Sequence, residues 1–383
     1  MKTQRIYESD ASVRRFSARV RSCTAHGQDF AVVLDRTAFF PGGGGQPCDL
    51  GTLGGARVLE VFEQDGEVVH VTQAPLNGEV AGELDWARRL DCMEQHSGEH
   101  ILSGTLHKLY GAENVGFHIG DPYVRVDVDL PLTAAQLAEA ERAANEAVRA
   151  DTPITARFPA PEELAGLTYR SKKELQGPVR IVSTAADTCA CCGTHLARTG
   201  QVGLIKIFSA QNYKGGVRLA VACGGRALRL LQTAWADAEE AGRQLSSAPG
   251  RLADAVSHLK QAQSGDKMRL AALQNSLAAA CAAAVQPGMP AVRTVEGADG
   301  DGLRKIALAC AGAAGAPCLC ISSTHGGTAY ALAAAPGGDV RPLCQALNEA
   351  FAGRGGGKAP FCQGNFAALP DEARLQALLR TFG

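Results

Sequence analysis

Two pairs of metal-binding side chains, about ninety residues apart, place the strongest constraint on how this chain folds. The segment EQHSGEHILSG at 94–104 carries His96 and His100. Four residues is just over one helical turn, so both imidazoles would leave the same face of a helix. A later segment, DTCACCGTHLARTGQVG, carries Cys191 and His195 at the same spacing. Three imidazoles and one thiolate suit Zn²⁺, so we expect the fold to bring both segments around one zinc ion.

The first segment also admits a different interpretation. Read as H-x-x-E-H, it matches the signature of inverzincin metallopeptidases, in which Glu99 would activate a zinc-bound water. Such an enzyme takes a downstream carboxylate as its third ligand, whereas here the downstream partner is a thiol and imidazole cluster. This difference argues against the peptidase without eliminating it, and Glu99 is the candidate general base.

Hydrophobic patterning predicts an α+β chain in four parts. Short β-like runs separated by HGQD, PGGGG and LNG are typical of a small β-barrel. A mixed α+β core follows, then a helical stalk rich in Ala, Leu and Gln, and finally a small α/β domain with Gly-rich turns. The predicted parts are the barrel at 1–88, the zinc-containing core at 89–225, the stalk at 226–285 and the last domain at 286–383.

Two helices of the core are defined by local signals. Apolar residues recur at three and four positions over 86–110, and the pattern stops at Gly111, which predicts one helix carrying the histidine pair. The segment LTAAQLAEAERAANEAVRA predicts a second amphipathic helix with Thr133 as its cap.

The composition restricts the partners and the compartment. The formal net charge is −1 over 383 residues, so a nucleic acid would have to meet a local basic patch. Thirteen cysteines without a secretory signal indicate reduced thiols or metal ligands rather than a disulfide framework. Because no apolar run reaches about 18 residues, we expect a cytoplasmic protein with no membrane partner.

Several motifs together resemble those of a known family. The pairing of QHSGEH with a later C-x-x-x-H in CGTHLARTGQVG is similar to the editing domain of alanyl-tRNA synthetases and to the free-standing alanyl-tRNA editing proteins. RTAFFPGGGGQPCDLGTL at 36–53 and GRGGGK at 353–358 are similar to further landmarks of that family, in the same order. The family usually reads C-G-G-T-H, whereas Cys192 stands at the second position here, so Cys189 and Cys192 are alternatives to Cys191 as the ligand.

The resemblance implies a trans-editing hydrolase of the long AlaX type. Such proteins hydrolyse the ester that joins serine, or in some cases glycine, to the tRNA for alanine. A C-terminal tRNA-binding domain is implied as well, and with the stalk it would form a homodimer. One Zn²⁺ per chain is expected, with the ligands His96, His100, Cys191 and His195.

The same resemblance nominates residues that meet the substrate. A site that separates serine from alanine must hydrogen-bond the serine hydroxyl. Thr37 and Gln46 are the candidates for this task, while Gly43 and Gly44 would admit close approach of the tRNA 3′ end. The clearest local basic stretches contain Tyr169, Arg170, Lys172, Lys173, Lys214 and Arg218. A non-catalytic tRNA-binding protein stays open as an alternative, because a closed four-ligand zinc site is usually structural.

Overall fold

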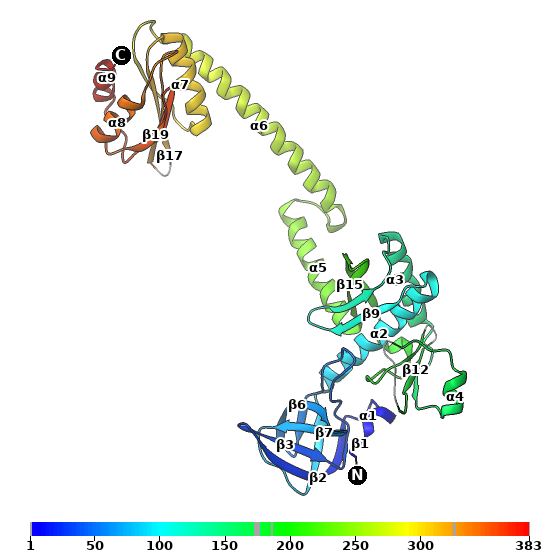
Figure 1. The fold of residues 1–383 in the computed structure, drawn as a ribbon. Helices are drawn as coiled ribbons and strands as arrows, with labels where there is room; N and C mark the ends of the chain where they lie inside the picture. Colours follow the sequence, from blue (N-terminus) through cyan, green and yellow to red (C-terminus); the bar gives the residue numbers. More distant parts are fainter. Residues whose placement is uncertain (1, 172–176, 185–186, 325–326, 383) are drawn as a thin grey trace. The chain divides into compact units, whose positions relative to one another are not determined.

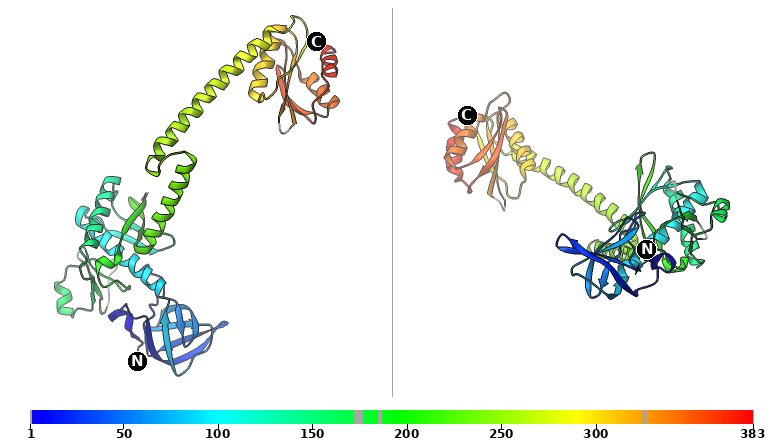
Figure 2. Two further views of the ribbon diagram at one scale, coloured as in Figure 1. Left: turned by 180° about the vertical axis from the view of Figure 1, so that it is seen from behind. Right: turned by 60° about the horizontal axis from the view of Figure 1, so that its bottom comes forward.

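The structure, a computed structural model, describes residues 2–171, 177–184, 187–324 and 327–382. The chain forms two compact units, Met1–Ala238 and Glu239–Gly383. They divide within helix α5 (Gly224–Gln244), later than the boundary expected after residue 225. Both units contain helices and strands, so the chain is a mixed α and β protein, as expected (Figures 1 and 2).

The first strands of unit 1 close into a six-stranded barrel (Figure 1). Alternate residues point inward, as in its last strand, where Val80, Gly82 and Leu84 are buried between exposed neighbours. The short strands β1 (Gln4–Arg5) and β4 (Arg36–Thr37) pair in parallel beside it, and helix α1 (Ile6–Ser9) follows β1. In barrel order the strands are β2 (Arg15–His26), β3 (Asp29–Leu34), β7 (Glu67–Thr72), β6 (Ala56–Gln64), β5 (Gly51–Leu53) and β8 (Glu79–Leu84).

Helix α2 (Trp86–Tyr110) leads from the barrel into the rest of unit 1. The Asp85 side chain accepts a hydrogen bond from the Arg88 N–H at its start, and Gly111 ends it with a left-handed φ of 67°. These caps confirm the range predicted from the sequence. Residues 95–106 are all buried, so the histidine pair lies inside the unit.

A four-stranded antiparallel sheet shares an apolar core with α2 and α3 (Ala134–Arg149). Its order is β14 (Ile205–Tyr213), β15 (Gly216–Cys223), β10 (Val124–Val128) and β9 (Asn114–Ile119). Thr133 and Gln136 form a complete capping box at the start of α3, which confirms the predicted cap.

A small three-stranded sheet supplies the second half of the candidate site. Its strands, in order, are β11 (Thr155–Arg157), β12 (Ile181–Ser183) and β13 (Thr188–Ala190), and helix α4 (Pro161–Gly166) lies between β11 and β12 in the chain. After β13 the chain turns through 191–198 into a 3₁₀ helix, η1 (Thr199–Val202). The Leu196 N–H donates to Ser97 Oγ at 3.0 Å, which ties this turn to α2.

Unit 2 is a five-stranded sheet with helices on both faces. Its order is β16 (Ala291–Thr294), β17 (Cys318–Thr324), β18 (Gly327–Ala333), β20 (Phe361–Phe366) and β19 (Arg354–Lys358). Helix α7 (Gly300–Ala314) packs on alternate sheet residues such as Cys320 and Ala331. Helices α8 (Arg341–Ala350) and α9 (Glu372–Arg380) pack on the other face of the sheet, against residues such as Ile321 and Leu332.

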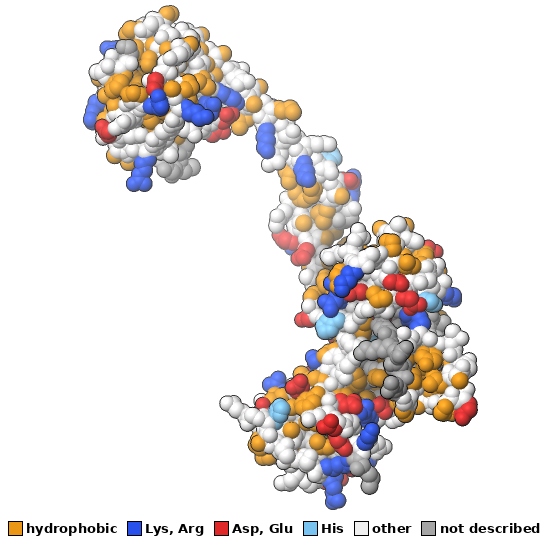
Figure 3. All heavy atoms as spheres, viewed as in Figure 1, with side chains coloured by type: hydrophobic (Ala, Val, Ile, Leu, Met, Phe, Trp, Pro, Cys, Tyr) orange, Lys and Arg blue, Asp and Glu red, His pale blue; other side chains and the backbone are white. Residues whose placement is uncertain are grey.

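A long exposed helix precedes this sheet. Helix α6 (Leu252–Ala283) follows a 3₁₀ turn, η2 (Pro249–Arg251). The structure describes every residue of this helix, and Ala278 is the only one that is buried. Large apolar side chains such as Met268 and Leu273 are 72% and 68% exposed on it, and orange patches mark such side chains along the helix in Figure 3. The expected homodimer through this stalk stays a prediction.

No helix in the described part of the chain has the length and apolar content that a membrane span requires. The described cysteines are all free thiols, as expected.

Candidate metal centre

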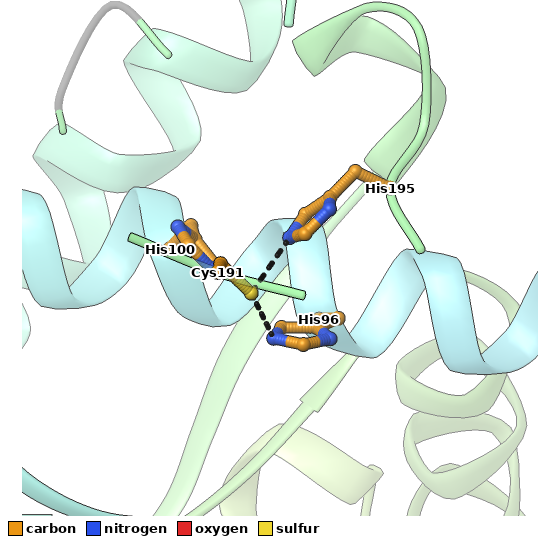
Figure 4. A group of neighbouring side chains, drawn as sticks. All are labelled: His96, His100, Cys191 and His195. Atoms are coloured by element: carbon orange, nitrogen blue, oxygen red, sulfur yellow. Dashed lines mark hydrogen bonds between the residues drawn. The ribbon is translucent and has the colours of Figure 1, made fainter. Parts of the chain in front are cut away.

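Four side chains from two segments converge inside unit 1 (Figure 4). His96 and His100 come from successive turns of α2, and Cys191 and His195 from the turn after β13. Their candidate donor atoms all lie within 4.8 Å of one another. Cys191 Sγ is 3.3 Å from His96 Nε2 and 3.8 Å from His195 Nε2. Tetrahedral zinc ligands stand about 3.5 Å apart, so the set fits such an ion.

Burial and neighbouring groups change the pKa values of His195 and Cys191 in the directions that favour metal binding. His195 Nδ1 is buried and has no hydrogen-bond partner among the described residues. Burial lowers the pKa of His195 to about 3, so its imidazole is neutral at physiological pH. Burial alone would raise the pKa of Cys191, but His96 and His195 lower it well below the ordinary thiol value. Neutral imidazoles and a thiolate are the forms that bind zinc.

Gln46 orients His96 from the glycine-rich segment. His96 Nδ1 lies 2.8 Å from Gln46 Oε1 and donates its N–H to that oxygen, which leaves Nε2 as the lone-pair donor toward Cys191. The Gln46 NH₂ donates to Thr194 Oγ1 at 2.8 Å, and the Thr194 N–H donates to Gln46 Oε1 at 3.2 Å. Gln46 therefore joins the two metal-binding segments, and its part in serine recognition stays a prediction.

His100 faces an acid and a second thiol. Its Nδ1 lies 3.4 Å from Asp187 Oδ2 and 3.3 Å from Cys189 Sγ. Burial alone would lower the pKa of His100, but Cys189 and Asp187 raise it well above the ordinary value. Arg170 holds Asp187 through two hydrogen bonds of 2.8 Å. A carboxylate behind a histidine commonly orients a metal ligand, so Asp187 is suited to that task.

The three neighbouring cysteines differ in their positions. His100, Asp187 and Cys189 form a second candidate donor set, so Cys189 is an alternative ligand on geometry. Cys192 is exposed and belongs to neither donor set found among the described residues.

Comparisons with known proteins agree with the family resemblance of the sequence motifs. Residues 179–219, which include Cys191 and His195, match the family model described as the threonyl and alanyl tRNA synthetase second additional domain. Alanyl-tRNA editing protein Aarsd1 of Mus musculus is 28% identical over 98% of this chain and 97% of its own length. Alanyl-tRNA editing protein AlaX-L of Pyrococcus horikoshii is 32% identical over 59% of each chain.

The chain is similar to the alanyl-tRNA editing proteins, in the case of Aarsd1 over nearly its whole length. It also matches the alanine–tRNA ligase of Pyrobaculum neutrophilum, with 34% identity over 95% of this chain. It spans 43% of the length of that ligase, whereas it covers nearly all of Aarsd1.

Thr37 ends β4, beside the barrel, and is fully buried. Its hydroxyl is 2.8 Å from His70 Nε2 and accepts the Phe39 N–H at 3.1 Å. His70 Nδ1 lies 3.1 Å from the Val32 carbonyl and donates to it, so Nε2 accepts the Thr37 proton. Burial lowers the pKa of His70 to about 4. The Thr37 hydroxyl is thus positioned by His70, and its contact with substrate stays a prediction.

The glycine-rich turn runs beside the donor cluster. Gly42 to Gly45 all have positive φ, from 60° to 126°, which glycine adopts readily. A Cβ on Gly45 would lie 2.4 Å from the Phe117 carbonyl oxygen, and the Phe117 ring stands 4.9 Å from the His96 ring. Gly43 and Gly44 are exposed at the tip, where the family resemblance expects the tRNA 3′ end.

Glu99 lies between His96 and His100 in the sequence and is buried. It forms hydrogen bonds with residues other than these histidines. Its Oε1 accepts from Ser103 Oγ at 2.5 Å and from the Asn114 amide. Neither donor set among the described residues includes Glu99. Its role as a general base stays a prediction.

The basic residues named from the sequence are partly engaged within unit 1. Arg170 holds Asp187, and Arg218 pairs with Asp127 through hydrogen bonds of 2.6 and 2.8 Å and lies 3.6 Å from the Tyr213 ring centre. Lys172 and Lys173 lie outside the described residues.

Two residues near the cluster, Asp187 and Arg180, were not predicted as site residues from the sequence. Asp187 opens the segment DTCACCGTH, and an acid beside a ligand-bearing run is a weak signal for a residue that orients a histidine. Arg180 is a single charge inside the apolar run PVRIV, where a strand would be expected to bury it. Its Nη1 donates to the carbonyls of Cys191 and Gly193 at 3.1 and 2.9 Å.

Proposed function

We propose that this protein is a trans-acting editing hydrolase that deacylates mischarged tRNA(Ala) in the cytoplasm, chiefly Ser-tRNA(Ala) and also Gly-tRNA(Ala). The observation that carries this proposal is the convergence of His96, His100, Cys191 and His195 in a chain that is similar along nearly its whole length to an alanyl-tRNA editing protein. We propose one zinc ion per chain at these four residues. When bound, zinc would polarise the ester carbonyl or lower the pKa of a water molecule.

The protein's own residues would set the position and the selectivity of the ester. The exposed glycines Gly43 and Gly44 would receive the 3′ end beside His96. Thr37 and Gln46 would form hydrogen bonds with the serine hydroxyl. The methyl group of alanine cannot form these bonds, so the two polar side chains would be left unpaired and alanine would be disfavoured. Glu99 is the proposed general base, and Glu99→Gln tests this role because glutamine can still accept from Ser103 and Asn114.

We propose a division of labour along the chain. The barrel at 1–88 and the core at 89–225 would hold the acceptor end and the ester. The stalk at 226–285 and the domain at 286–383 would bind the body of the tRNA and form a homodimer. The strand β19, RGGGK, supports this assignment because all five of its residues are exposed and basic side chains begin and end it.

The test is a deacylation assay with the full-length, zinc-loaded protein on Ser-tRNA(Ala), Gly-tRNA(Ala) and Ala-tRNA(Ala), together with a panel of peptides. We expect release of serine, slower or comparable release of glycine, and retention of alanine. Peptide cleavage with intact Ser-tRNA(Ala) would replace the proposal by the metallopeptidase. Binding of tRNA without hydrolysis would replace it by a non-catalytic protein with structural zinc.

A further inference from the structure

Arg180 is a buried cation with no acidic partner among the described residues. Arg180 directly precedes β12 in the chain and is 6% exposed. Its hydrogen bonds run from Nη1 to the carbonyl oxygens of Cys191 and Gly193. Its Nε is buried and has no partner in the described part of the chain. Cys191 and Glu8 favour its charged form, but a buried N–H without a partner is costly, so a ligand that supplies an oxyanion to Nε would stabilise this site.

The unused edge of Arg180 is the one that binds oxyanions elsewhere in this protein. A guanidinium presents Nε–H and Nη2–H in parallel, which matches two oxygens of a carboxylate or a phosphate. This edge holds a carboxylate in Arg89, Arg170, Arg218 and Arg226, whose partners are Asp49, Asp187, Asp127 and Asp91. In Arg180 neither nitrogen of the edge bonds to a described residue, while Nη1 fixes the orientation of the group.

The position of Arg180 connects this edge to the donor cluster. The turn that its Nη1 holds carries Cys191, a member of the cluster. Gly193 in the same turn lies against His96, since a Cβ there would stand 2.2 Å from His96 Cε1. A ligand that brings an ester to the cluster would therefore bring its neighbouring oxyanions close to Arg180.

We propose that the Nε and Nη2 edge of Arg180 binds an oxyanion of the aminoacylated acceptor end of tRNA. This inference rests on the proposed deacylase function. The oxyanion has two possible sources, the phosphodiester next to the terminal adenosine or the oxygen of the acyl carbonyl as negative charge develops on it. Both offer oxygens to the same planar pair of N–H groups.

The experiment compares Arg180→Gln and Arg180→Lys in the full-length protein. Arg180→Lys keeps the charge but lacks the planar edge. Arg142→Gln is the matched control, because Arg142 is an exposed arginine of α3 paired with Glu146 and its loss removes the same charge. Zinc content and melting temperature are measured first. The affinity for an uncharged acceptor-stem RNA ending in CCA is then measured over a range of salt concentrations, and the single-turnover rate on Ser-tRNA(Ala) at saturating enzyme.

A phosphodiester contact predicts that both variants bind the RNA about tenfold more weakly, and that Arg180→Gln, which alone removes the charge, also has a salt slope smaller by about 0.7 to 0.9. The difference from wild type should vanish with RNA that lacks the terminal nucleotide. An acyl contact predicts unchanged RNA affinity and a rate lower by on the order of 100-fold. Arg142→Gln should match wild type in both measurements.

The proposal is overturned if the zinc-loaded variants keep both wild-type affinity and wild-type rate. It is also overturned if both variants lose zinc while RNA affinity and its salt slope stay unchanged, because Arg180 would then only support the turn. Failure of the proposed function has a different signature, since wild-type protein itself would leave Ser-tRNA(Ala) intact.

Discussion

At the scale of single residues, the zinc assignment depends most on Cys191. Its sulfur lies within 4 Å of two imidazole nitrogens, so Cys191→Ala should lose most of the bound zinc. Cys192→Ala is the matched control and should keep one zinc per chain, because Cys192 is exposed and outside both described donor sets. Metal analysis of the purified variants checks this. Full occupancy in Cys191→Ala, with loss in Cys189→Ala, would move the ligand to Cys189.

The buried His70 predicts a dependence of barrel stability on pH. Its folded pKa of about 4 lies below the unfolded value of about 6.5, so its contribution is complete above pH 6.5 and falls away as the pH drops toward 4. The loss is about 3 kcal/mol at most. Hydrogen exchange of β3 and β7 amides, corrected for intrinsic rates, measures it. His70→Gln should flatten the profile, and identical profiles for both proteins would contradict the assignment.

Some residues of the site could be predicted from the sequence, and others could not. The four zinc candidates were found because each pair has helical or turn spacing and suitable donor chemistry. The contact of Gln46 with His96 and that of Asp187 with His100 could not be found this way, because each joins residues brought together only by the fold. The buried pairing of Thr37 with His70 is likewise invisible in local pattern, since it depends on how the barrel closes.

At the scale of elements, the turn after β13 tolerates only a small residue beside His96. A Cβ at position 193 would lie 2.4 Å from His96 Nδ1, so Gly193→Ala should displace the imidazole and weaken zinc binding by about 1–3 kcal/mol. Competition with a chelator measures the zinc affinity. Gly265→Ala in α6 is the control, because a Cβ there meets nothing within 4 Å. Equal zinc affinity in both variants would show that the turn is not constrained as described.

Elements with local caps were predictable, and those held by long-range pairing were not. Helix α2 follows its predicted range because Asp85 and Gly111 mark its ends, and α3 begins at Thr133 for the same reason. The strands β11, β12 and β13 have three residues each, too few to show a period, and they exist through pairing with one another.

At the scale of the whole molecule, the division into two units predicts separable tasks. Truncation after Ala238 should leave one zinc per chain and weaken tRNA(Ala) binding by about tenfold, since unit 2 would be lost with its exposed RGGGK strand. The cut belongs there rather than at residue 225, because Arg226 pairs with Asp91 and Ala227 is fully buried. Filter binding and metal analysis check both parts. Unchanged affinity would assign tRNA recognition to unit 1.

The most direct measurement follows Ser-tRNA(Ala) and Ala-tRNA(Ala) in one reaction with the full-length protein, first stripped of metal and then restored with one equivalent of zinc. We expect the zinc-restored protein to release serine on the order of 100-fold faster than alanine, and the stripped protein to release neither amino acid. Equal rates for the two esters, or decay of Ser-tRNA(Ala) at its spontaneous rate with zinc bound, would contradict this expectation.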